Sequence, residues 1–374
     1  MPHITPHQVW SVIAKNNRLF VPQSIEKAIL DCIGDPIDAV KKAGEELITT
    51  FNIYDKAINL NYDQTSIVDA YSLYYLRRNS LIPRIAIRDM VLNHNLQAFP
   101  DQLHVLDLGS GTGAVTLGLL DMFLYYPFNQ INITVDAVDI SPLSLARLKQ
   151  LQAAAGLSRF QVNTDAIDLN DVSFLDGVLY LNEPYDLIFV ANVFNELEHQ
   201  KSCEVLACLS KHLTDSSTIV IANAQRDFIK NLQPLLINEA HNDGLYVYYP
   251  CPPNLANNSI AHQCWFWREH DYDCNRLRTK GGQFISGNYR DELVATWLIL
   301  SNKPYSIFDD FITQYPDLEW GTFRIWGKDS RVDNCQVCTN HGTKFLGKQE
   351  NIYKRGSLVG CSGNPLQIQQ YIEL

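Results

Sequence analysis

The chain has 374 residues, enough for one large elaborated domain or two smaller ones, and 46% of them are hydrophobic. Its formal net charge of −11 argues against broad electrostatic binding of nucleic acid, which needs clustered Lys and Arg side chains. No apolar run reaches the roughly 18 residues of a membrane span, and the N-terminal segment lacks the features of a secretory signal. The sequence therefore predicts a cytoplasmic protein with no membrane span.

The first part of the chain has the apolar spacing of helices. Residues 24–34 and 36–51 each repeat apolar side chains on one helical face, and residues 66–95 predict two helices that break near Pro83. We therefore expect an N-terminal helical region over residues 1–95.

Short apolar strands then alternate with helices. The predicted helices span residues 114–126, 142–156 and 202–213, and the predicted strands span 104–109, 132–141, 159–165, 185–192 and 217–223. This alternation predicts an α/β fold with a Rossmann-like, doubly wound parallel sheet over residues 96–250. Two later strands, 243–250 and 292–302, are expected to pair antiparallel at the sheet edge. Between them lies a Cys-containing insertion, 251–292, and residues 293–374 are expected to hold the last core strand and a β extension.

A glycine-rich loop follows the first buried strand. The segment Gly109-Ser110-Gly111-Thr112-Gly113 leads directly into a helix. Glycines let the backbone turn sharply and approach a ligand, and the helix N-terminus offers free N–H groups. Two cofactor classes are bound by loops of this geometry. The loop alone does not separate them, because Gly109, Gly111 and Ala114 also match the G-x-G-x-x-G/A sequence pattern of dinucleotide-binding proteins.

Acidic residues around this loop separate the two cofactor classes. Asp107 lies two residues before the first glycine, where it would repel a pyrophosphate and attract a cationic sulfonium ligand. Asp139 ends the second strand and can accept hydrogen bonds from ribose hydroxyls in either case. After the third strand, either Asp165 or Asp168 can accept the amino group of adenine, with Asp168 the more readily explained as a solvated loop carboxylate.

The fourth strand ends in further polar residues. It places Asn192, Asn195 and Glu196 at the carboxyl edge of the sheet, where ligands bind in open α/β folds. Asn195 and Glu196 have a second interpretation as caps at the start of the following helix.

Together, the segments VLDLGSGTG, VDAVDIS, NTDAIDL and YDLIFVANVFNELE resemble class I S-adenosylmethionine-dependent methyltransferases over residues 103–223. The resemblance implies S-adenosylmethionine as the cofactor and direct methyl transfer to a small-molecule, peptide or protein acceptor. It implies Glu196 and Asn195 as candidate catalytic residues. The implied cofactor contacts are Asp107, Gly109, Ser110, Gly111 and Gly113 at the methionine part, Asp139 and Ile140 at the ribose, Asp165 at the adenine, and Asn192 at the strand end.

The flanking segments resemble a narrower group, the methyltransferase-like proteins associated with the small ribosomal subunit in bacteria and mitochondria. The matching pieces are AYSLYYLRRNSLIPRIAIRDMVL, YVYYPCPPN followed by QCWFWREH, and NCQVCTNHG. This resemblance implies an alternative function, a cofactor-binding, metal- or iron–sulfur-carrying assembly factor of the small ribosomal subunit. The chain departs from that pattern because it lacks a further cysteine soon after Cys251, where His262 is a substitute. Its acidic charge also suits ribosomal RNA poorly.

Six of the nine cysteines lie in the last third of the chain. Cys251, Cys264, Cys335 and Cys338 can supply four thiolates to a zinc ion or an iron–sulfur cluster, with Cys274 and Cys361 as alternates. Independent thiols, or a redox pair at Cys335 and Cys338, are the other interpretations. Cys32, Cys203 and Cys208 have apolar helical neighbours and are predicted to be small buried side chains.

Overall fold

The computed structural model describes most of the first 304 residues and five strands beyond them. The described residues are 4–91 apart from 5, 16–17, 36–37, 53–61 and 63; 100–223 apart from 181–182; then 231–249, 268–273, 292–304, 306, 309, 317, 319–325, 335–339, 342–347, 358–362 and 367–372.

The N-terminal part is mainly helical, as predicted. Its elements are α1 (Pro6–Ile13), β1 (Ala14–Lys15), β2 (Arg18–Phe20), α2 (Gln23–Ile33), α3 (Asp38–Asn52), α4 (Thr65–Tyr71), the π-helical turn η1 (Ser72–Leu76), α5 (Arg77–Asn79) and α6 (Ile82–Val91). The predicted break near Pro83 is confirmed, because α5 and α6 are separated at Ser80 and Leu81. Pro83 occupies the first turn of α6, where its missing N–H has no intrahelical partner to lose.

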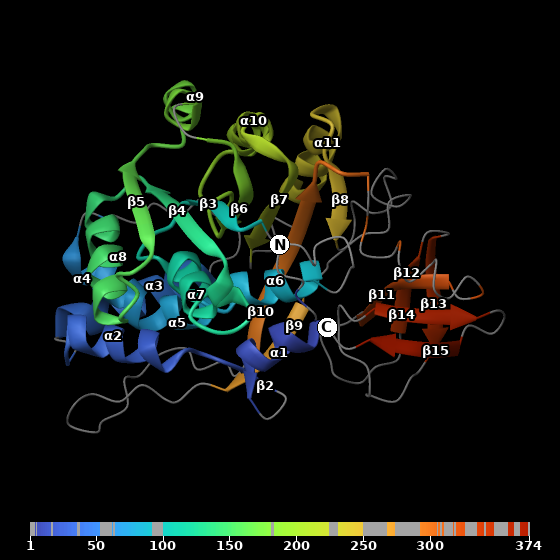
Figure 1. The fold of residues 1–374 in the computed structure, drawn as a ribbon, viewed down its shortest axis with the longest axis horizontal. Helices are drawn as coiled ribbons and strands as arrows, with labels where there is room; N and C mark the ends of the chain where they lie inside the picture. Colours follow the sequence, from blue (N-terminus) through green and yellow to red (C-terminus); the bar gives the residue numbers. More distant parts are fainter. Residues whose placement is uncertain are drawn as a thin grey trace.

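A large mixed sheet forms the centre of the molecule (Figure 1). Its strands are β3 (Gln102–Leu108), β4 (Asn132–Asp139), β5 (Gln161–Ala166), β6 (Tyr185–Ala191), β7 (Leu213–Asn223), β8 (Tyr246–Tyr249), β9 (Arg268–Asp273) and β10 (Glu292–Ser301). With β2 and β1 of the N-terminal part, the spatial order is β5-β4-β3-β6-β7-β10-β9-β2-β1, and β8 also pairs with β10. The strands β3 to β7 are parallel, whereas β10 is antiparallel to β7 and β8. The predicted parallel sheet and its late antiparallel pair are confirmed.

Helices cover both faces of this sheet. The linking helices are α7 (Ala114–Met122), the 3-10 turn η3 (Phe128–Gln130), α8 (Pro142–Ala154), α9 (Val172–Tyr180), α10 (His199–Ser210) and α11 (Gln233–Asn242). In Figure 1, α9, α10 and α11 lie on one side of the strands and α7 lies with the N-terminal helices on the other. The sheet has a hydrophobic core on each face, and successive residues of a strand point to opposite faces. Val105 accordingly packs in one hydrophobic cluster and Leu106 in the other. Two buried faces explain why the central strands read as continuous apolar runs.

The N-terminal helices are fixed to the sheet by a buried ion pair. Arg84 on α6 is fully buried, and its Nη1 lies 2.9 Å from Asp121 Oδ2 on α7. Its Nη2 donates to the Val12 carbonyl at 2.9 Å, and Ser24 Oγ donates to Asp121 Oδ1 at 2.7 Å. One buried guanidinium therefore connects α1, α6 and α7, while Ser24 adds α2.

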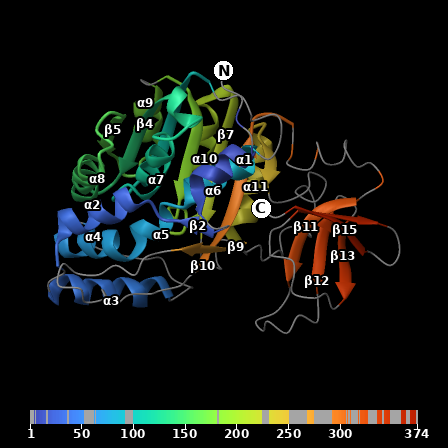
Figure 2. The ribbon, with the colours of Figure 1, turned by 60° about the horizontal axis from the view of Figure 1, so that its bottom comes forward.

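A second sheet follows the main one in the chain. It contains β11 (Glu319–Ile325), β12 (Cys335–Thr339), β13 (Gly342–Gly347), β14 (Leu358–Ser362) and β15 (Gln367–Ile372). The order is β13-β12-β11-β14-β15, with every pair antiparallel. Figures 1 and 2 both show it beside the main sheet rather than within it. Among the described helices, none is both long and apolar enough to cross a membrane.

Candidate functional site

A cavity of about 240 Å³ opens at the carboxyl ends of the parallel strands. It lies where the chain order reverses, since β3 is flanked by β4 on one side and β6 on the other. Its wall is formed by Gly109, Gly111, Asp139, Ile140, Ser144, Asp168, Leu169, Asn170, Ala191, Asn192, Val193, Glu196 and Leu197, and by Tyr62, Val68 and Tyr71 from the N-terminal region. The sheet therefore supplies the floor, and the N-terminal helical region supplies one side.

The glycine loop has a backbone that only glycine adopts easily. Gly109, Gly111 and Gly113 have φ values of 67°, 54° and 89°. A Cβ on Gly109 would lie 2.2 Å from Val193 Cγ2, and one on Gly113 would lie 2.0 Å from Leu148 Cδ1. On Gly111 the nearest atom would be Tyr71 Cε1 at 3.9 Å. The outer two glycines thus permit close packing, while the middle one leaves space toward the cavity.

Asp139 joins the end of β4 to this loop. Its Oδ2 accepts a hydrogen bond from the Gly111 N–H at 2.8 Å, and its Oδ1 accepts one from the Ser141 N–H at 2.9 Å. Burial raises the pKa of Asp139, and the two N–H donors oppose this. Each carboxylate oxygen keeps a further lone pair, so Asp139 can still accept from a ligand.

Asp107 lies beneath the loop and does not line the cavity. It is 1% exposed, and its Oδ2 accepts hydrogen bonds from Thr116 N at 3.0 Å and Thr116 Oγ1 at 2.6 Å. Burial raises the pKa of Asp107 to about 7, and the Thr116 donors act in the opposite direction. The structure therefore places Asp107 as a support for the first turn of α7.

Glu196 lies in the cavity wall, on the turn after β6. Its Oε1 accepts a hydrogen bond from the Tyr62 hydroxyl at 3.2 Å. Burial among protein groups raises the pKa of Glu196 to about 8, the charge of Asp139 raises it further, and the Tyr62 hydroxyl lowers it. Glu196 nevertheless exposes much of its surface to the open cavity, so the shift will be complete only when a ligand excludes water.

The helix-cap interpretation of Asn195 and Glu196 is wrong. The helix α10 begins at His199 with Glu198 at its N-cap position. Asn195 is not part of the cavity wall, and its Oδ1 accepts a hydrogen bond from Asn223 Nδ2 at 2.8 Å. Of the two candidate catalytic residues, only Glu196 therefore reaches the cavity.

The two carboxylates after β5 differ in their position relative to the cavity. Asp168 lines the cavity, and its Oδ1 accepts hydrogen bonds from Asn170 N and Asn170 Nδ2, both at 2.9 Å. Asp165 is exposed on β5 and is not part of the wall. Asp168 is also exposed, as expected of a solvated loop carboxylate, so the adenine contact stays a prediction.

Two other predicted contacts lie on the cavity wall. Ile140 is 56% exposed at its mouth. Asn192 adopts a φ of 58°, and its N–H donates to the Ala222 carbonyl at 2.8 Å. The left-handed residue allows the chain to leave β6 sharply and turn toward Glu196.

Sequence reasoning missed two tyrosines of the cavity. Tyr62 is held by its carbonyl, which accepts a hydrogen bond from Ser141 Oγ at 3.0 Å. The Tyr71 ring stacks on Tyr75 with a centroid distance of 5.5 Å. Burial raises the pKa of both Tyr62 and Tyr71, so their hydroxyls stay protonated. The tyrosine-rich segment at 71–75 is a sequence signal for Tyr71, but it does not include Tyr62.

The predicted four-thiolate site is only partly within the described residues. Cys251 and Cys264 lie outside them, as does the alternate Cys274. Cys335 and Cys338 lie on β12, where their backbones pair with Ile325 and Thr322 of β11. The four-thiolate site therefore stays a prediction. Burial of Cys203 and Cys208, at 8% and 2% exposure, is confirmed.

The cavity fits S-adenosylmethionine in its chemistry. The space above Gly111 would be filled by any Cβ, and the carboxyl groups of Asp139, Asp168 and Glu196 face a ligand that carries a sulfonium and an ammonium cation. In the described part of the loop, the buried hydroxyls of Ser110 and Thr112 have no hydrogen-bond partner, but neither residue is part of the cavity wall. The predicted contact at Ser110 is therefore not among the residues that line the cavity, whereas Gly111 leaves space for a bound molecule.

A family model agrees with this assignment over the core of the chain. Residues 106–219 match a family model described as a methyltransferase domain, and no curated protein matches the chain. Among solved structures, magnesium protoporphyrin IX methyltransferase from Synechocystis PCC 6803 with bound cofactor is 13% identical, with 72% of this chain and 99% of that chain covered and a TM-score of 0.38. An O-methyltransferase family protein from Burkholderia thailandensis is 13% identical, with 72% of each chain covered and a TM-score of 0.39.

Proposed function

We propose that this chain, whose residues 106–219 match a methyltransferase domain, is a class I enzyme that transfers a methyl group from S-adenosylmethionine to a nucleophile bound beside Glu196. The observation that carries the proposal is the shared cavity. Gly109, Gly111 and Asp139 line the same space as Glu196 and Tyr62. A cofactor bound at the glycine loop and an acceptor bound beside Glu196 would therefore share this cavity.

Residues of the sheet edge would hold the cofactor. Asp139 has free lone pairs for ribose hydroxyls while its N–H donors fix its orientation. Asp168 and Asn170 lie farther along the edge and are assigned to the adenine end. When bound, S-adenosylmethionine supplies a methyl group activated by its attachment to a cationic sulfur.

Glu196 is proposed as the general base for the acceptor. A carboxyl group with a pKa near 8 can take a proton from the attacking hydroxyl, amine or thiol at close to neutral pH. The acceptor atom gains the methyl group, its proton passes to the Glu196 carboxylate, and the electron pair of the broken carbon–sulfur bond stays on sulfur. The Tyr62 hydroxyl fixes the carboxylate by donating to Oε1.

The acceptor is proposed to be a small molecule or the side chain of a peptide or protein. Val68, Leu197 and the two tyrosines make the side of the cavity near Glu196 largely apolar. This surface favours an acceptor with an apolar or aromatic body around its nucleophilic atom. No observation favours the ribosomal assembly function, so it is not proposed.

The test combines cofactor binding with a search for methylated product. Calorimetry of the full chain should show cofactor binding that Asp139→Ala weakens and the exposed control Asp165→Ala leaves intact. Mass spectrometry should then detect a gain of one methyl group on an acceptor from a chemically diverse panel. Absence of binding at millimolar cofactor would overturn the cofactor site, whereas binding without transfer to any acceptor would overturn the enzymatic proposal alone.

The four-thiolate site of Cys251, Cys264, Cys335 and Cys338 stays a separate proposal. Its ligand set suits zinc or an iron–sulfur cluster. Metal analysis and an absorption spectrum of protein purified without oxygen test it directly. Protein that carries neither zinc nor iron would refute it.

A further inference from the structure

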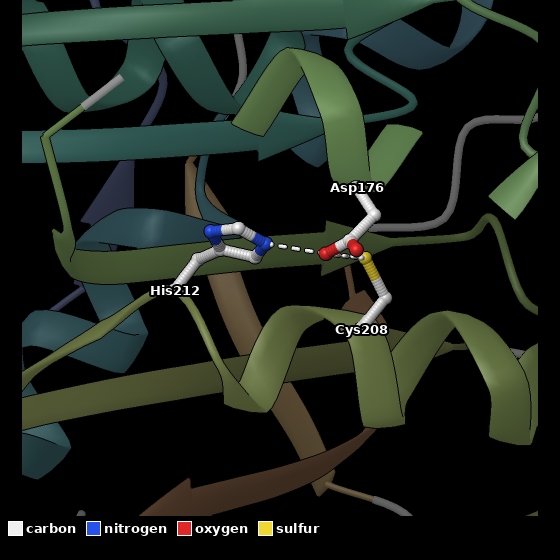
Figure 3. A group of neighbouring side chains, drawn as sticks. All are labelled: Asp176, Cys208 and His212. Carbon is white, nitrogen blue, oxygen red and sulfur yellow. Dashed lines mark hydrogen bonds and ion pairs between the residues drawn. The ribbon is translucent and has the colours of Figure 1, made fainter. Parts of the chain in front are cut away.

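We propose a second ligand site, a zinc site formed by Asp176, Cys208 and His212 (Figure 3). Asp176 comes from α9, Cys208 from the last turn of α10, and His212 from the link between α10 and β7. Figure 3 shows the three side chains converging on one point. Nothing in the methyl-transfer proposal uses them.

The ligand atoms already have nearly the spacing that zinc requires. His212 Nε2 lies 2.8 Å from Asp176 Oδ1, Cys208 Sγ lies 3.6 Å from the same oxygen, and one ligand atom of each residue falls within 4.8 Å of the others. Tetrahedral zinc with bonds of about 2.0–2.3 Å sets a nitrogen and an oxygen about 3.4 Å apart, and a sulfur and an oxygen about 3.6 Å apart. The sulfur-to-oxygen distance therefore matches the zinc geometry, and the nitrogen-to-oxygen distance would have to lengthen by roughly half an ångström.

The backbone holds two of the three ligands in place. Cys208 and His212 are four residues apart, a spacing that brings side chains together at the end of a helix. The His212 N–H donates to the Leu209 carbonyl at 3.1 Å, and the His212 carbonyl accepts from the Tyr185 N–H at 2.8 Å. These bonds fix His212 between α10 and the start of β6.

Burial leaves the site open on one side only. Cys208 is 2% exposed, and the His212 side chain is 11% exposed, whereas that of Asp176 is 48% exposed. Metal ions can therefore enter past Asp176, and water can fill the fourth coordination position. One nitrogen, one sulfur and one oxygen form a ligand set that zinc accepts.

Zinc binding would replace the contacts within the cluster. The Cys208 thiol and the His212 Nε2 atom both contact Asp176 Oδ1. Without metal, the thiol keeps its proton and donates to Asp176. On binding, the sulfur forms a bond to zinc and the thiol proton leaves to solvent.

A nucleophilic role for Cys208 does not fit this geometry. In a catalytic cysteine–histidine pair the imidazole accepts a hydrogen bond from the thiol. Here the His212 Nε2 atom faces Asp176, and the Cys208 thiol donates to the same carboxylate. The cluster also lies before β7 begins, whereas the cofactor cavity lies at the carboxyl ends of the strands. A zinc ion here would therefore link α9 to α10, away from the chemistry.

The test counts zinc bound to the metal-free full chain by competition with a chromogenic chelator. The wild type should bind one equivalent more than Asp176→Asn or Cys208→Ser, because other cysteines contribute equally to all three proteins. Cys203→Ser, another buried cysteine on α10, is the matched control and should keep the wild-type count. At this site the ligand substitutions should weaken zinc by more than the roughly 10–100-fold that loss of an outer-shell partner costs.

A second measurement locates the ion. Zinc should slow alkylation of Cys208 at least tenfold and leave Cys203 unchanged, as mapped by fragmentation of the peptide that contains both. Asp176→Asn keeps the shape of a partly exposed side chain, so it tests the site even if Cys208→Ser fails to fold. Equal zinc counts in the wild type and Asp176→Asn, or no selective protection of Cys208, would overturn the proposal.

Discussion

Replacing Gly109 with alanine tests the geometry of the glycine loop most directly. The new Cβ would lie 2.2 Å from Val193 Cγ2, in a backbone with a φ of 67°. Left-handed backbone costs a residue with a side chain about 1–2 kcal/mol. Overpacking a tight site adds about 1–3 kcal/mol. The free energy of unfolding should therefore fall by about 2–5 kcal/mol. For a chain of 374 residues this lowers the Tm by roughly 3–6 °C.

Gly156→Ala is the matched control. Gly156 has a φ of 73°, but a Cβ there would have no atom within 4 Å. It should therefore cost only the backbone strain of about 1–2 kcal/mol. The difference between the two variants measures the contact with Val193.

Calorimetric unfolding with and without cofactor provides the assay, because a ligand stabilises the part of the chain that binds it. Val193→Ala in the Gly109→Ala background should restore stability, with a coupling of about 0.5–3 kcal/mol in a double-mutant cycle. Two results would refute the reasoning. One is equal destabilisation by Gly109→Ala and Gly156→Ala, and the other is no coupling to Val193.

Three further predictions concern the carboxylates. Asp139→Ala should weaken cofactor binding by roughly 10- to 150-fold, which is the value of a hydrogen bond to a charged group. Asp165→Ala should leave the affinity unchanged, and calorimetric titration with the cofactor measures both affinities. The rate of methyl transfer should rise with pH up to about 8, the pKa of Glu196. Glu196→Gln should slow the reaction by about 10²–10⁴-fold and remove this pH dependence. A pH–rate profile that still rises in the variant would contradict the assignment of Glu196 as the base. Asp107, with a folded pKa of about 7 above its ordinary 3.8, binds its proton more tightly when folded, so stability should fall as the pH rises between those values. That loss amounts to about 4 kcal/mol, and urea unfolding of Asp107→Asn should show a flatter pH dependence.

Local sequence patterns were sufficient to predict the parallel sheet and its glycine loop. Continuous apolar strands, Gly109 and the Asp139 position all depend on residues adjacent in sequence, so their periodicity and spacing are visible. Whether Asp165 or Asp168 lines the cavity depends on a contact between strands. The Ile167 N–H donates to the Asp139 carbonyl at 3.0 Å, which continues the pairing past Asp165 and brings Asp168 to the cavity.

Longer-range contacts could not be predicted from the sequence. Tyr62 meets Glu196 across 134 residues, and no periodicity connects them. The sequence does not reveal the turn before α10, and Glu196 was therefore also interpreted as a helix cap. The Glu196 N–H donates to the Val193 carbonyl at 2.8 Å, so the chain turns once and the helix begins three residues later. The grouping of Cys208 with Asp176 likewise requires two helices that only the folded sheet brings together.

The position of β10 has a consequence for how the chain folds during synthesis. The parallel strands β3 to β7 are complete at Asn223, but β10, which covers the open edge of β7, ends at Ser301. At about 5–20 residues per second, translation leaves that apolar edge unpaired for roughly 4–16 s. An exposed strand edge is a template for pairing with another chain. Nascent chains arrested within this interval should therefore depend most on chaperones, even though their cofactor-binding strands are already made.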